Sequence, residues 1–253
     1  MSDPARIRHC QTLTSYTSYP PTSLVLSTPS AATYKLVLAY ATPVYPAHWS
    51  IGATELIIRN DRADAGNPAS PSTAALSVVA SRSTKAFEIP PGFIDERKMQ
   101  AVKEQWGRKV LTVADTQTDG KWVILGPGDP SSSASTSPKY SPTALQLYRL
   151  HLPVSSSSSA PPRMTFVRSL HGHMGPVSAL SVADGRCVSL GVDGSIWVWD
   201  LEAGTGAEVA THPDYTGLDR GVDSSGKRGS VVFDERRIVT ADARGLEVRR
   251  FDI

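Results

Sequence analysis

Short stretches of alternating apolar and polar residues, separated by turn-forming residues, make up most of the chain. The clearest are VSALSVA (177–183), RCVSLG (186–191) and SIWVWDL (195–201), which are joined by Asp184-Gly185 and Asp193-Gly194. A period of two places alternate side chains on opposite faces of a strand, and Asp-Gly between two such stretches favours a tight hairpin. The pattern therefore predicts an antiparallel meander of three strands.

The same order of apolar stretches recurs in two other parts of the chain. Upstream, VLTVADTQTDGKWVILG (110–126) is followed by TALQLYRL (143–150), with a Ser/Pro-rich excursion at 127–142 between them. Downstream, VVFDERRIVT (231–240) is followed by GLEVRRFDI (245–253). These copies predict a fold built from one repeated sheet unit.

The first 90 residues show a weaker form of this pattern. Four stretches there have the composition of strands and are broken by turn residues: SLVLST, TYKLVLAYA, ATELIIRND and AALSVVAS. We expect them to form one divergent copy over 20–90. The preceding residues 1–19 are expected to be poorly ordered, as is the Ser-rich segment 153–162, because neither can bury much apolar surface.

One segment has helical periodicity instead. Met99, Val102 and Trp106 fall on one face of a helix over 93–107, and Gly107 suits the C-terminal end. We expect this single short helix to lie between two copies of the sheet unit, so that the fold class is all-β with one helix.

Composition narrows the classes of partner. Of 253 residues, 40% are hydrophobic and 20% charged, and the net charge of +2 gives no overall attraction to nucleic acid or to an anionic membrane. Cys10 and Cys187 are too few for a disulfide framework. The chain has no apolar stretch of membrane-spanning length or signal-peptide character, so we expect it in the cytoplasm or nucleus.

Three dipeptides carry a family resemblance. Gly172-His173, Asp193-Gly194 and Trp199-Asp200, at their present spacing, resemble the repeat of WD-repeat proteins, whose four-stranded blades surround a channel. The resemblance implies a partial WD-repeat-like β-propeller of about four blades. The expected blades cover 20–90, 108–152, 164–201 and 229–253.

The resemblance also implies a structural polar set within the third blade. Family members hold a His, a Ser or Thr, an Asp and a Trp in one buried hydrogen-bonded group, and His173, Ser189, Asp193 and Trp199 match those positions. Pairing a buried imidazole with a carboxylate would lock a loop, a turn and a strand together. The other copies lack the full set, so we expect them to depend on apolar packing alone.

About four blades are visible, whereas propellers of this family usually have about seven. We expect the chain to be the C-terminal part of a longer protein. Two alternatives stay open: a strongly diverged N-terminal half, and self-association in which the blades are completed by a second chain.

No residue pattern indicates catalysis or a cofactor. His171 and His173 lack a third metal ligand at usable spacing, no serine lies in a GxSxG motif, and the Gly-rich turns lack the Lys-Ser/Thr of a phosphate loop. We therefore expect no enzyme activity, no metal and no cofactor.

The last copy is rich in arginine, with Arg236, Arg237, Arg244 and Arg249 as candidate interaction residues. One hypothesis is a site for phosphate or an acidic peptide built from Arg side chains. The other is ordinary exposed charge that protects a late strand from edge pairing. Arg236 and Arg237 are expected at the opposite end of one strand from Arg244, so these residues cannot share a single phosphate.

The expected function is a protein-protein interaction scaffold. The ending FDERRIVTADARGLEVRRFD loosely resembles the last blade of fungal-type F-box/WD-repeat proteins, the substrate receptors of ubiquitin ligases, which would make the chain a substrate-receptor or adaptor module. The expected partners are other proteins, not nucleic acid or membrane. Two alternatives remain: a hydrolase on an all-β propeller scaffold, and a truncated fragment without independent function.

Overall fold

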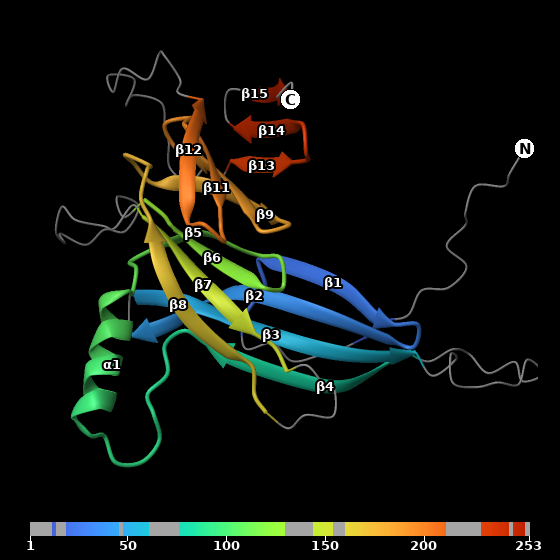
Figure 1. Cartoon of the computed structure of the whole chain (residues 1–253), viewed down its shortest axis with the longest axis vertical. Coiled ribbons are helices and arrows are strands. Elements are labelled where there is room, and N and C mark those ends of the chain that lie inside the picture. Colours follow the sequence, from blue (N-terminus) through green and yellow to red (C-terminus); the bar gives the residue numbers. More distant parts are fainter. Residues whose placement is uncertain are drawn as a thin grey trace, which may run out of the picture.

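A computed structural model of the chain describes residues 12–13, 19–45, 48–60, 76–129, 144–153, 160–210, 229–242 and 245–250. These residues form antiparallel sheets and one short helix (Figure 1). The expected all-β class, with blade-like sheets and a single helix, is confirmed.

Four sheets follow one another along the chain, and in each the strand order is the chain order. The first blade contains β1 (Ser23–Ser30), β2 (Thr33–Tyr45), β3 (His48–Asn60) and β4 (Leu76–Lys85). The second contains β5 (Val113–Thr118), β6 (Trp122–Pro127), β7 (Leu145–His151) and β8 (Arg163–Leu170). The third contains β9 (Val177–Ala183), β10 (Arg186–Gly191), β11 (Ile196–Asp200) and β12 (Thr205–Ala210). The fourth contains β13 (Ser230–Phe233), β14 (Arg237–Asp242) and β15 (Gly245–Arg250).

The Asp-Gly pairs form the hairpin turns that the sequence predicts. Asp184 and Gly185 both have positive φ, 48° and 73°, as a two-residue hairpin turn of type I′ requires. In the second blade, Asp119 Oδ1 accepts hydrogen bonds from the backbone N–H groups of Lys121 and Trp122, at 2.9 and 2.7 Å. These turns join the first and second strands of the second and third blades.

Neighbouring blades pack face to face in the order of the chain. Strand β5 contacts β1 and β2 of the first blade and β9 of the third, and β13 contacts β9 and β10. The first strands of successive blades therefore adjoin one another, as they do around the channel of a propeller. Figure 1 shows the first and fourth blades at the two ends of this stack.

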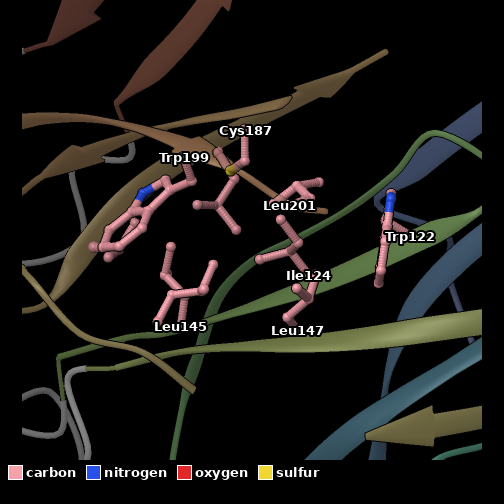
Figure 2. Close-up of a cluster of buried hydrophobic side chains, with 10 residues drawn as sticks. Trp122, Ile124, Leu145, Leu147, Cys187, Trp199 and Leu201 are labelled. Atoms are coloured by element: carbon pink, nitrogen blue, oxygen red, sulfur yellow. The ribbon is translucent and has the colours of Figure 1, made fainter. Parts of the chain in front are cut away.

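The core between the second and third blades is the best developed. Figure 2 shows Ile124, Leu145 and Leu147 of the second blade meeting Cys187 and Trp199 of the third. All five side chains are buried. Burial raises the pKa of the Cys187 thiol far above its ordinary value, so this cysteine is a protonated, small core residue.

The structure divides the chain differently from the expected blade boundaries. Arg163–Leu170 was expected to begin the copy 164–201, but it pairs with β7 and forms the outer strand of the second blade. Thr205–Ala210 pairs with β11 and adds a fourth strand to a unit expected to have three. The reason is that each outer strand continues the meander of the preceding strands, and the chain crosses to the next blade only afterwards.

The helix α1 (Glu96–Gly107) starts later than position 93, because Asp95 caps it by accepting a hydrogen bond from the Lys98 backbone N–H at 2.8 Å. Trp106 holds the helix against the first blade through ring contacts with His48 and Phe87, at centroid distances of 6.0 and 5.9 Å. The helix thus lies between the first and second blades in sequence, as expected.

Candidate functional site

The third blade holds a group of buried polar side chains centred on Ser189. The Ser189 hydroxyl accepts a hydrogen bond from the Trp199 indole N–H at 2.8 Å and lies 2.7 Å from His173 Nε2. Ser189 is fully buried, and His173 and Trp199 are 7% and 2% exposed. One hydroxyl on β10 thus joins the loop before β9 to the indole on β11.

Asp193 reaches the imidazole through a residue that sequence reasoning missed. The Ser195 hydroxyl donates a hydrogen bond to Asp193 Oδ1 at 2.7 Å and lies 3.0 Å from His173 Nδ1. The Asp193 carboxylate also accepts the backbone N–H of Ser195 at 3.0 Å. The structure therefore brings all four expected residues together, with Ser195 as a fifth member. The sequence feature that could have revealed Ser195 is its place directly after Asp193-Gly194, because an Asp side chain in a turn can accept a hydrogen bond from the residue two positions later.

Burial sets the charge state of this group. Desolvation lowers the pKa of His173 from 6.5 to about 4, although the Asp193 charge acts in the opposite direction. The imidazole is therefore neutral near pH 7 and serves as one donor and one acceptor. The hydrogen bonds of this imidazole hold a loop, a strand and a turn together.

Glycines make room for this group. A Cβ on Gly172 would lie 2.7 Å from the Trp197 ring, which explains why the residue before His173 is glycine. A Cβ on Gly191 would lie 2.3 Å from Asp193 Oδ1 and 2.6 Å from Ser195 Oγ. At both positions an added methyl group would have to displace packed atoms.

Gly191→Ala is therefore expected to lower the free energy of unfolding by about 1–3 kcal/mol, the usual cost of forcing extra atoms into a packed site. Urea denaturation followed by tryptophan fluorescence measures it. Gly175→Ala is the matched control, because a Cβ at Gly175 meets nothing within 4 Å. Equal losses for the two variants would contradict the packing argument.

The second blade has a different buried polar group, so the expectation that it depends on apolar packing alone is wrong. Tyr148 occupies the position that Trp199 has in the third blade, and its hydroxyl donates to Gln146 Oε1 at 2.7 Å. The Gln146 amide in turn donates to the backbone carbonyl of Arg108 at 2.7 Å. This chain of hydrogen bonds ties the second blade to the end of α1. Desolvation by burial raises the pKa of Tyr148 to about 12, so its hydroxyl remains a donor.

Within the part of the chain that the structure describes, no group of three His, Cys, Asp or Glu side chains is placed to hold a metal ion. His171, the second member of the candidate pair, is exposed. No helix among the described segments is long and apolar enough to cross a bilayer.

The three candidate arginines that the structure describes do not converge as a group. Arg236 lies in the β13–β14 turn and Arg237 begins β14, and their backbone N–H groups donate to Asp234 Oδ1 at 2.8 and 2.7 Å. Arg249 pairs across the strands with Ile238, on the side facing the third blade, and forms an ion pair with Glu247 at 2.7 Å. Arg244 lies outside the described residues, as do Cys10, Phe251 and most of the 127–142 excursion.

The hairpin register places two arginines, Arg237 and Arg250, opposite each other. These two residues are directly opposite each other on β14 and β15, on the face turned away from the third blade. Side chains at such positions are close neighbours, and like charges there destabilise the sheet. Sequence reasoning missed the pair because the hairpin register, not the spacing along the chain, sets it.

Arg250→Glu is expected to stabilise the fold by about 0.2–1 kcal/mol, because it replaces a repulsive cross-strand pair with an attractive one. The shift in the urea midpoint measures the effect, and high salt should diminish it. Arg163→Glu is a suitable control, since Arg163 is an exposed strand residue opposite His151. Destabilisation by Arg250→Glu would show that Arg237 and Arg250 are not in repulsive contact.

Both ends of the blade stack expose large apolar side chains. On β15, Leu246 and Val248 are 72% and 52% exposed. On β1, Leu24 and Leu26 are each 62% exposed. These residues define two surfaces that are named here the fourth-blade outer face and the first-blade outer face.

Comparison with known proteins gives structural similarity only. No family model matches the chain, and no curated protein matches it. The computationally designed Ika4 protein aligns with a TM-score of 0.40 and 16% identity, covering 96% of this chain and 100% of its own. The C-terminal WD40 domain of Sif2 aligns with a TM-score of 0.35 and 12% identity, covering 84% of this chain and 44% of that domain. The computationally designed Ika8 protein aligns with a TM-score of 0.37 and 13% identity, covering 91% of this chain and 70% of its own. These low scores do not place the chain in a family, and the blade architecture rests on its own strand pairing.

Proposed function

We propose that this chain is a WD-repeat-type scaffold that binds other proteins through the open faces of its terminal blades. The observation that carries the proposal is the fourth-blade outer face, where Leu246 and Val248 are mostly exposed. The role is binding without catalysis, and we place it in the cytoplasm or nucleus.

The alternation along β15 is the reverse of that in an ordinary edge strand. Glu247 and Arg249 share the sheet face of Thr240 and Ile238, which are buried toward the third blade. Leu246 and Val248 point the opposite way, where the described chain provides no neighbouring blade. A soluble edge strand normally turns its apolar side chains inward and its charged ones outward. The reversed pattern suits a strand whose outer face is covered by another protein.

Cross-strand pairing extends this face into a small apolar sheet surface. Val239 is opposite both Val232 and Val248, so the three side chains form one row across the blade. Ala241 and Leu246 form the next pair. A flat face of β-branched and aliphatic side chains fits another sheet or an amphipathic segment.

A finer assignment follows from the loose resemblance of the last blade to F-box/WD-repeat proteins. As part of the proposal, the chain acts as a substrate-receptor or adaptor module that presents a bound protein to a larger assembly. What supports it is the arginine-rich ending with its apolar outer face.

Quantitative affinity capture from the protein's own cell type tests the scaffold role. The bait is the whole chain, compared with Val248→Glu, which places a charge in the middle of the fourth-blade outer face. We expect Val248→Glu to lose the specific partners and to keep its circular dichroism spectrum. Phe93→Glu is the matched control, because Phe93 is 84% exposed and lies next to α1. Identical partner sets for the wild-type chain and Val248→Glu would overturn the proposed binding face.

A further inference from the structure

We infer, on the basis of the binding faces proposed above, that a second copy of this chain is the partner of the two outer faces. The first-blade outer face of one copy would pack on the fourth-blade outer face of the other. Two copies related by a twofold axis would form two such contacts and close a ring of blades.

The first-blade outer face has the same construction as its counterpart on the fourth blade. Leu36 is opposite both Leu26 and Leu56, so three leucines form a row across β1, β2 and β3. Leu24 and Leu38 form the next pair. Val37 and Ala39, which alternate with these leucines, are the residues buried against the second blade. These leucines lie on the face turned away from the second blade, where Leu38 and Leu56 are buried at 4% and 5% exposure and Leu24 and Leu26 on β1 are each 62% exposed. The open part of the first-blade outer face is therefore the part that β1 forms.

The interior of the stack shows how such faces pair. The second blade buries Val123 and Leu125 toward the first blade, and Ile124 and Leu147 toward the third. The third blade likewise buries Trp199 on one side and Val188 on the other. Interior blades are thus apolar on both faces. Each contact joins the side of one blade that is turned forward along the chain to the side of the next blade that is turned backward. The two outer faces are the open ends of this same series.

The direction of the contact explains why the partner is a second copy. The first-blade outer face is turned toward where a preceding blade would lie, so it needs the forward side of another blade. The fourth-blade outer face is turned toward where a following blade would lie, so it needs the backward side of another blade. Each copy carries one first-blade outer face and one fourth-blade outer face, at the opposite ends of its stack (Figure 1). A contact between two different faces closes into a ring when the rotation is right, and two copies of four blades fall within the four to eight blades typical of propellers.

Sedimentation velocity and light scattering on the full chain test the inference. We expect a dimer at micromolar concentration. Leu26→Glu and Val248→Glu, one on each outer face, are each expected to raise the dimer dissociation constant at least about 30-fold, as buried interface residues at the centre of a contact do. Phe93→Glu should leave the dissociation constant unchanged. Circular dichroism and the thermal midpoint confirm that each variant is folded.

Mixing the two variants gives the sharper test. A dimer of Leu26→Glu with Val248→Glu contains one contact in which both faces are wild-type. We therefore expect the mixture to associate more tightly than either variant alone. Association that Val248→Glu weakens and Leu26→Glu does not would indicate like-with-like packing and would overturn the inference, as would open chains of many copies.

A monomer at all concentrations would also overturn the inference, but not the proposed function. In that case the affinity capture decides separately, because a monomeric chain that loses its partners on Val248→Glu still binds a different protein through the fourth-blade outer face. If Val248→Glu weakens neither the self-association nor the capture of partners, both the inference and the proposed function are wrong.

Discussion

Replacing Ser189 with alanine is expected to lower the free energy of unfolding by about 2–5 kcal/mol. The Ser189 hydroxyl satisfies both the Trp199 indole N–H and His173 Nε2, and all three groups are buried. Its removal leaves two buried polar atoms without this partner, and each unsatisfied group costs about 1–3 kcal/mol. The small cavity adds to the loss. Urea denaturation near pH 7 measures the change.

Ser181→Ala is the control for the serine substitution itself. Ser181 lies on the neighbouring strand β9 opposite Val188, is half-buried, and is not part of the polar group. A change within about 0.5 kcal/mol is expected there, as for most substitutions away from a packed or hydrogen-bonded site. If Ser189→Ala costs no more than Ser181→Ala, the polar group does not stabilise the third blade.

Local patterns in the sequence predicted the strands and turns well because their causes are local. Period-two alternation sets the two faces of β9 and β10, and Asp184-Gly185 can adopt the positive φ values of a tight hairpin. The helix was predictable for the same reason, since its periodicity and its end signals lie within one segment. The all-β class follows from these elements.

The outer strands were assigned poorly because their pairing is not a local property. Most of β12 is exposed and its apolar pattern is weak, so little in the sequence separates it from a loop. Strand β8 alternates well, but nothing in its own residues indicates that it pairs backward with β7 and not forward with β9. Edge strands take their place from the sheet that they join.

The third-blade polar group was predictable only through the family resemblance. His173, Ser189 and Trp199 are far apart in the sequence, and hydrogen-bond geometry cannot be calculated from spacing. Gln146 and Arg108 in the second blade had no such resemblance to reveal them. The outward direction of Leu246 and Val248 was likewise hidden, because alternation shows that a strand has two faces without showing which one is covered.

Lowering the pH is expected to remove about 3 kcal/mol of stability through His173. The folded protein holds the pKa of this imidazole at about 4, mainly because burial disfavours its charged form, whereas the ordinary value is 6.5. The unfolded chain therefore takes up a proton that the folded chain resists. The contribution is complete above about pH 6.5 and is lost as the pH falls toward 4.

Comparison of histidine variants separates this effect from the titration of carboxylates, which occurs in the same range. The free energy of unfolding, measured by urea denaturation between pH 4 and pH 7.5, should fall less steeply for His173→Gln than for the wild-type chain. His171→Gln should follow the wild-type profile, because His171 is exposed two positions away. The difference between the two variant profiles therefore reports the buried imidazole alone. Parallel profiles for the two variants would mean that His173 titrates normally in the folded state and is not held neutral by burial.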